Sequence, residues 1–180
     1  KVMKELSFPY VVEVYQYNEE RNEYRMEFCD DTLRDYIKKR NANLAFASRK
    51  RIALQFLYGI NYLHAKGLLH RDISLQNVLL KVFHDGAVLV KLSDFGLVKD
   101  QTSTFTRTQT EMRGTIRDPL LHDFKNYGVL NEMYAVGWVL SYIFTGREAL
   151  SSGTDRVSQI IQKCAVLDLK LRYQTVLELI

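Results

Sequence analysis

Hydrophobic and polar residues alternate in the first thirty positions, which is typical of β-strands with one exposed face. The alternation runs over residues 11–17 and returns over 23–28, with a polar segment between the two. This pattern predicts a β-hairpin near the start of the chain. A second hairpin is predicted where the apolar runs 78–82 and 88–92 flank the Asp-Gly pair at 85–86, because this pair is a strong turn signal.

Apolar residues spaced three and four positions apart predict helices elsewhere in the chain. Thr32 is suited to cap a short helix, and Ser48 to cap a longer one that ends at Gly67. The broad apolar face of residues 131–145 predicts another helix, and residues 156–180 are expected to form one or two more. Because short strands come first and helices follow, the predicted fold class is α+β and mostly helical.

The composition is that of an ordinary globular protein. Of the 180 residues, 47% are hydrophobic and 26% are charged, which is enough to build one compact core. The net charge of +4 comes from scattered lysines and arginines, so we expect no nucleic-acid partner. No apolar run approaches the roughly 20 residues of a membrane helix, so no membrane partner is expected either.

The cysteine content indicates a reducing compartment. Cys29 and Cys164 are too few and too far apart for a disulfide scaffold or a zinc site. No secretory signal opens the sequence. We therefore expect a cytoplasmic protein with two reduced thiols.

Three polar residues follow one another at a spacing that suits phosphoryl transfer. Asp72 and Asn77 come shortly after the predicted long helix, and Asp94 follows the second predicted hairpin. Phosphoryl transfer needs an aligned nucleophile and neutralisation of the charge that grows on the phosphate oxygens. Asp72 is suited to orient the attacking hydroxyl. Asn77 and Asp94 offer the hard oxygen ligands that magnesium prefers.

Two of these residues lie in the tripeptides His70-Arg71-Asp72 and Asp94-Phe95-Gly96. These tripeptides, with Asn77 five residues after Asp72, resemble the catalytic loop and the metal-binding motif of eukaryotic-like protein kinases. The resemblance implies a kinase C-lobe over residues 30–180. Residues 1–29 are expected to hold the end of the regulatory helix, a remnant of the N-lobe sheet and the hinge. The implied function is an ATP- and magnesium-dependent phosphotransferase, foremost a protein serine/threonine kinase. Its partner would be a protein substrate that presents a serine or threonine hydroxyl.

The same resemblance implies a nucleotide site. Met26 corresponds to the gatekeeper, and the backbone at Glu27 and Cys29 corresponds to the hinge that would bond adenine. Leu79 corresponds to the apolar floor beneath the adenine ring, and Asp94 would hold the phosphates through magnesium.

Further roles follow from the alignment of the catalytic loop and the segment after it. Thr115 would contact the catalytic aspartate, and Glu132 stands where the family has an aspartate that holds the catalytic-loop backbone. Arg71 could pair with a phosphorylated residue of the threonine-rich surface loop 99–115. A solvated loop with incidental threonines remains the alternative for that segment.

The sequence also departs from the family pattern. No glycine-rich loop and no phosphate-binding lysine precede the hinge. We therefore expect a fragment that is inactive alone and whose apolar surface is covered by a missing N-lobe or by a partner.

Three further departures concern the C-lobe. Ser74 stands where serine/threonine kinases carry a lysine, and residues 151–155 are too short for the helix usually found there. Leu120 and Leu121 replace the expected acidic residue after Pro119, so the buried arginine, Arg172, is expected to lack its ion-pair partner. A small-molecule phosphotransferase of kinase-like fold and a non-catalytic pseudokinase or docking module remain alternatives.

Overall fold

Two small antiparallel sheets carry the strands of this chain. The computed structural model describes residues 6–18, 20–21, 23–94 and 116–180. Strand β1 (Val14–Asn18) pairs with β2 (Glu23–Met26). A separate sheet has the order β3-β4-β5 and contains β3 (Asp31–Thr32), β4 (Val78–Val82) and β5 (Val88–Leu92).

The second predicted hairpin is confirmed at its predicted bounds, with Gly86 at a φ of 80° in the turn. A positive φ suits glycine, which has no Cβ to clash with the backbone. The first hairpin begins later than predicted, because its first residues pair with another strand. The amide of Val12 donates to the carbonyl of Leu92 over 2.9 Å, and the amide of Leu92 donates to the carbonyl of Tyr10 over 2.9 Å.

Helices make up most of the regular secondary structure in the described chain. They are α2 (Leu33–Arg40), α3 (Phe46–Ala65), α4 (Val129–Thr145), α5 (Arg156–Ala165) and the short 3₁₀ turns η2 (Phe124–Asn126) and η3 (Val176–Leu179). The predicted α+β class is therefore confirmed. In the described part of the chain, none of these helices combines the length and the hydropathy needed to cross a lipid bilayer.

One of the two predicted helix N-caps is found in the structure and the other is not. Thr32 caps α2 as predicted, because its Oγ1 accepts from the amide of Asp35 over 3.1 Å. The prediction of Ser48 as a cap was wrong: α3 begins at Phe46, and Ala45, three residues before Ser48, occupies the cap position without a side-chain hydrogen bond. The amide of Ser48 donates to the carbonyl of Ala45 and so already lies in the first turn.

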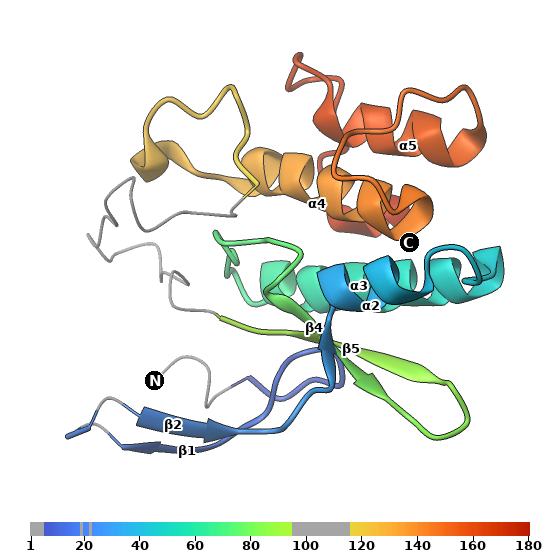
Figure 1. The fold of residues 1–180 in the computed structure, drawn as a ribbon. Coiled ribbons are helices and arrows are strands. Elements are labelled where there is room, and N and C mark those ends of the chain that lie inside the picture. The colour runs from blue at the N-terminus through green and yellow to red at the C-terminus, as the bar shows by residue number, and fades with distance from the viewer. Residues whose placement is uncertain (1–5, 19, 22, 95–115) are drawn as a thin grey trace.

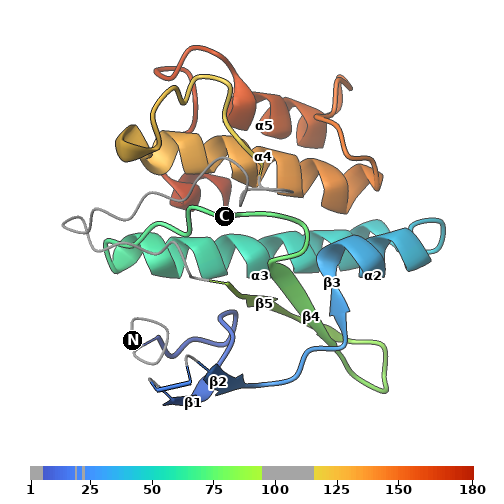
Figure 2. The same ribbon diagram turned by 60° about the vertical axis from the view of Figure 1, so that its left-hand side comes forward.

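Helix α3 lies at the centre of the molecule. Figures 1 and 2 show α4 and α5 on one side of it and the β3-β4-β5 sheet on the other, with β1 and β2 beyond that sheet. The close approach of α3 to β5 occurs at Gly59, where a Cβ would lie 2.8 Å from Cδ1 of Leu92. Glycine at this position therefore lets the end of β5, which leads to Asp94, pack directly on the helix.

Candidate active site

A buried carboxylate holds the loop that follows α3. Glu132 on α4 has no exposed surface, and its side chain accepts from the amides of His70 over 3.1 Å and Arg71 over 3.0 Å. Arg71 has a φ of 64°, an unusual conformation that these bonds stabilise. The predicted role of Glu132 in holding the loop backbone is confirmed.

Other groups complete the environment of this carboxylate. The Nε2 atom of His64, at the end of α3, lies 2.9 Å from Oε1 of Glu132, and the hydroxyl of Tyr127 donates to Oε2 over 3.3 Å. Burial alone would raise the pKa of Glu132, but the bonds from His64 and from the Arg71 amide outweigh it and lower the pKa. Burial also lowers the pKa of His70, which favours its neutral form.

Asn77 joins the loop that follows α3 to the strand that leads to Asp94. Its Nδ2 donates to the backbone carbonyl of Asp72 over 2.8 Å. Its own backbone carbonyl accepts from the amide of Ser93 over 2.9 Å and from the Ser93 hydroxyl over 3.0 Å. Asp94 follows directly, with a φ of 56°. The three predicted oxygen-bearing residues therefore lie on segments that are hydrogen-bonded to one another.

The donor chemistry of this cluster fits a magnesium ion. Because Nδ2 of Asn77 is bonded to the carbonyl of Asp72, its amide oxygen could act as a ligand atom, and Asp94 would supply a carboxylate. Within the described ranges there is no group of three or more histidine, cysteine, aspartate or glutamate side chains that could hold a metal. A magnesium site here would depend on one amide, one carboxylate and the oxygens of the phosphates themselves.

Ser74 is turned into the loop. It is buried, and its Oγ accepts from the amide of Asn77 over 3.2 Å. The side chain that replaces the family's lysine therefore supports the loop backbone and is not directed into solvent.

Three of the predicted nucleotide-site residues, Met26, Glu27 and Cys29, lie at the end of β2 and in the connection to β3, whereas Leu79 lies on β4. Met26 ends β2 and is 40% exposed, whereas Leu79 on β4 is half-buried and pairs with Thr32. Cys29 is half-buried. Its burial, and to a smaller extent the negative charge of Glu27, raise the pKa of its thiol to about 11.

The side chain of Glu27 has a role that the sequence did not indicate. It is 6% exposed, and its carboxylate contacts Nζ of Lys91 at 2.6 Å and Nζ of Lys81 at 3.2 Å. Both lysines interrupt the apolar runs that form β4 and β5. A lysine within a buried strand needs a carboxylate partner, so these interruptions were the available signal.

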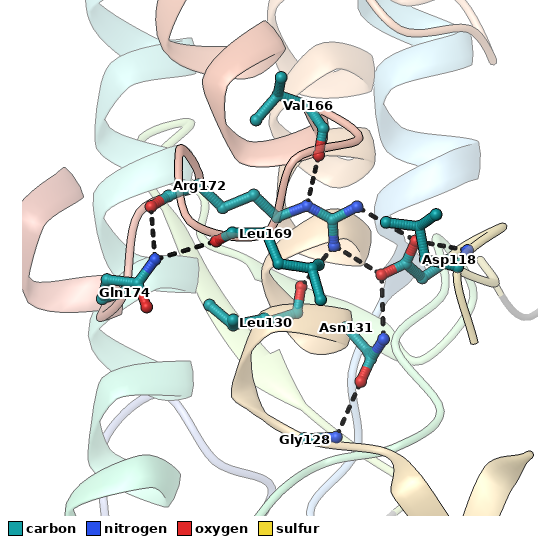
Figure 3. Close-up of polar contacts among 9 residues, drawn as sticks. Asp118, Gly128, Leu130, Asn131, Val166, Leu169, Arg172 and Gln174 are labelled. Carbon is teal, nitrogen blue, oxygen red and sulfur yellow. Dashed lines mark hydrogen bonds and ion pairs between the residues drawn. The ribbon is translucent and has the colours of Figure 1, made fainter.

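Arg172 has an ion-pair partner, so the prediction that it lacks one was wrong. Figure 3 shows its guanidinium facing the carboxylate of Asp118, with Nη1 to Oδ2 at 2.5 Å and Nη2 to Oδ1 at 3.1 Å. Both side chains are fully buried. The acidic partner, Asp118, precedes Pro119 instead of following it. The prediction missed it because it looked for an acidic residue only after the proline.

The same carboxylate is tied to the start of α4. Nδ2 of Asn131 donates to Oδ2 of Asp118 over 3.0 Å, and Oδ1 of Asn131 accepts from the amide of Gly128 over 3.0 Å (Figure 3). Burial alone would raise the pKa of Asp118, but the bonds from Arg172 and the Leu120 amide outweigh it and lower the pKa. The segment around Pro119 is thus fixed to α4 and to the end of the chain.

Some predicted features lie outside the described residues: Thr115, Phe95, Gly96 and the loop 99–115. The guanidinium of Arg71 lies 6.0 Å from the ring centroid of Phe124. Its buried Nε has no hydrogen-bond partner among the residues that the structure describes.

Comparison with known proteins extends these observations. The protein kinase domain family matches residues 1–177. Cyclin-dependent kinase F-3 of Oryza sativa subsp. japonica is 30% identical over 170 residues, covering 93% of this chain and 38% of that protein. Serine/threonine-protein kinase RAD53 of Saccharomyces cerevisiae is 31% identical over 170 residues, covering 86% of this chain and 20% of that protein.

Solved kinase structures share the fold. The crystal structure of the Rad53 kinase domain and SCD2 matches with a TM-score of 0.75 at 24% identity, over 98% of this chain and 70% of that one. The complex of the same protein with AMPPNP matches with a TM-score of 0.73 at 23% identity, over 98% and 73%. The chain spans less than two fifths of the two curated relatives named above. With a family match over nearly every residue, and with serine/threonine kinases among its relatives, this chain belongs to the protein kinase domain family.

Proposed function

We propose that the protein containing this chain is an ATP- and magnesium-dependent protein serine/threonine kinase. The observation that carries the proposal is the bonding of Asn77 to both the Asp72 carbonyl and Ser93, which joins the catalytic loop to the residue before Asp94. The serine/threonine kinases among the relatives and the fold shared with a kinase that binds AMPPNP support it.

Each residue would have a defined task. Asp72 would orient the acceptor hydroxyl and accept its proton. Magnesium, held by Asn77 and Asp94, would neutralise charge on the phosphates. The backbone at Glu27 and Cys29 would bond the adenine ring, with Met26 and Leu79 as its apolar surroundings.

Regulation would use the residues beside the catalytic aspartate. Arg71 carries a buried Nε without a hydrogen-bond partner in the described part of the chain, which supports pairing with a phosphorylated residue of the loop 99–115. Thr115 would contact Asp72 when a protein acceptor is bound. The unpaired cysteines, Cys29 and Cys164, support a cytoplasmic location.

The buried Ser74 favours one second candidate, a kinase-like phosphotransferase that acts on small molecules. A lysine at this position would stabilise the transferred phosphate of a protein kinase, whereas Ser74 bonds to the loop. An acceptor that brings its own positive charge would make the lysine unnecessary.

The test is transfer of labelled γ-phosphate from ATP by the full-length protein. Replacing Asp72 with alanine should reduce transfer to a generic protein acceptor by about 10²–10⁴-fold. The matched control is Asp85→Ala in the exposed hairpin turn, which should retain full activity. Undiminished transfer by the Asp72 variant would overturn the proposal. Labelling of small metabolites alone would favour the second candidate.

A further inference from the structure

We propose that Glu27 is a positioning residue: through Lys91, its buried carboxylate fixes the hinge and the segment before β1 against β5. Under the proposed function, this pair sets the distance between the adenine-binding hinge and Asp94. That consequence rests on the proposed function, whereas the structural coupling does not.

The contacts converge on one oxygen. Oε1 of Glu27 accepts from Nζ of Lys91 at 2.6 Å and from the amide of Glu13 at 2.9 Å. The amide of Glu27 donates back to the carbonyl of Glu13 over 2.9 Å. Nζ of Lys91 also reaches the carbonyl of Val11 at 3.4 Å. One ion pair therefore contacts the hinge, β5 and the segment that precedes β1.

The strand geometry explains why a lysine occupies this place. Val90 and Leu92 on β5 have no exposed surface and face the core. Successive side chains of a strand point to opposite faces, so Lys91 lies on the face opposite the core. On that face the ammonium group contacts the carbonyl of Val11 and the carboxylate of Glu27, and the Lys91 side chain is only 9% exposed.

The two lysines around Glu27 differ in a way that allows a matched comparison. The side chain of Lys81 is 35% exposed and lies at 3.2 Å, so water can replace its contact. The side chain of Lys91 is buried, so loss of either charge of this pair leaves the other uncompensated. Of the two lysines, Lys91 should therefore contribute more to the coupling between the hinge, the segment before β1 and β5.

Lys91 also lies three residues before Asp94, which follows the end of β5. Loss of the pair should release the end of β5 from the hinge while the core contacts of Val90 and Leu92 persist. A nucleotide that spans the hinge and Asp94 would then have to order both of these segments when it binds. The entropy lost in this ordering would weaken the affinity for the nucleotide.

The deciding experiment is hydrogen exchange at the backbone amides of Val12, Glu13, Glu27 and Leu92 in the full-length protein. In Lys91→Met these amides should exchange about tenfold faster, while the core amides of α3 remain unchanged. The control Lys81→Met should match the wild type, and Lys91→Arg, which keeps the charge, should restore slow exchange. If Lys91→Met does not fold, Glu27→Gln supplies the same test, because it removes the charge and keeps the shape.

Kinetics give a second measurement. In Lys91→Met the KM for ATP should rise by about tenfold, while kcat changes less than twofold. Equal exchange in the Lys91→Met and Lys81→Met variants would overturn the proposal. A wild-type protein that transfers no phosphate would refute the proposed function, and the exchange result would still decide the role of Glu27.

Discussion

Buried charged side chains fix this structure at positions where segments far apart in the sequence meet. Arg49 on α3 donates to the backbone carbonyls of Asn41 and Ile143, each over 2.6 Å, and of Leu44 over 3.1 Å. Burial lowers the pKa of this guanidinium, but these three carbonyls and Oδ1 of Asn41 at 2.9 Å accept from its donors. Arg172 solves the same problem with a carboxylate. In both cases, hydrogen bonds within the folded protein replace those that the guanidinium makes to water in the unfolded chain.

The Arg172–Asp118 pair gives the first prediction. Replacing Arg172 with methionine leaves a fully buried carboxylate without its counter-ion, so the free energy of unfolding should fall by about 3–5 kcal/mol. Urea denaturation measures this. The control is Arg34→Met, which removes a bidentate but exposed ion pair with Glu148 and should change stability little. Equal losses in the two variants would contradict the argument.

The second prediction concerns the pH dependence of the loop anchor. The pKa of Glu132 in the folded protein lies below its ordinary value of 4.5. The ionised carboxylate therefore contributes stability above pH 4.5, and this contribution is lost as the pH falls below that value. Glu132→Gln should lower the free energy of unfolding by about 1–3 kcal/mol at neutral pH.

The difference between Glu132→Gln and the wild type should shrink as the pH falls below 4.5, because the wild-type carboxylate becomes neutral once the pH passes below its lowered pKa in the folded protein. Urea unfolding of both proteins over this range measures the change. A difference that stays constant with pH would show that the charge of Glu132 is not what holds the loop.

At the scale of elements, local signals were sufficient where the turn chemistry was strong. The bounds of β4 and β5 follow from two apolar runs around an Asp-Gly pair. The helix near 131–145 starts two residues earlier than predicted, at Val129, and ends before Gly146, whose φ of 69° stops it. The start of β1 was misplaced because residues 10–12 pair with β5, a partner that lies some 80 positions away in the sequence and leaves no local signal.

The same distinction applies to the candidate site. That the segments of Asp72, Asn77 and Asp94 meet could be predicted because their spacing resembles a known motif, and their roles stay a prediction. The partner of Arg172 could not, since Asp118 lies 54 positions away and on the unexpected side of Pro119. Side-chain pairs of this kind depend on how elements pack, which periodicity does not report.

The third prediction tests the packing of α4 on α5. A Cβ on Gly137 would lie 2.7 Å from Cβ of Cys164 and 3.2 Å from the carbonyl oxygen of Ile161. Gly137→Ala gains about 1 kcal/mol of helix propensity, but the overlap forces the helices apart at a typical cost of about 1–3 kcal/mol. The net loss should appear as a lower melting temperature. Gly128→Ala is the control, because only Asn131 comes as near as 4.0 Å to the added methyl.

At the scale of the whole molecule, the β1-β2 sheet has an unusual surface for a globular chain. Tyr15 is 60% exposed, Tyr24 47% and Met26 40%, and Phe28 in the following hinge is 78% exposed. Large apolar side chains grouped on one small sheet are typical of a surface that packs against something else. This supports the expected cover by an N-lobe or by a partner, and it lies beside the proposed nucleotide site.

The last prediction follows from that surface. The hinge and Asp94 would contact only the adenine and magnesium sides of a nucleotide, and the 180-residue sequence has neither a glycine-rich loop nor a phosphate-binding lysine before the hinge. The isolated chain should therefore bind ADP with magnesium with a dissociation constant no tighter than about 1 mM, roughly −4 kcal/mol. Isothermal titration calorimetry measures this, with the full-length protein as the positive control. Micromolar binding by the isolated chain would mean that the described residues suffice to hold the phosphates, and the dependence on an N-lobe would be wrong.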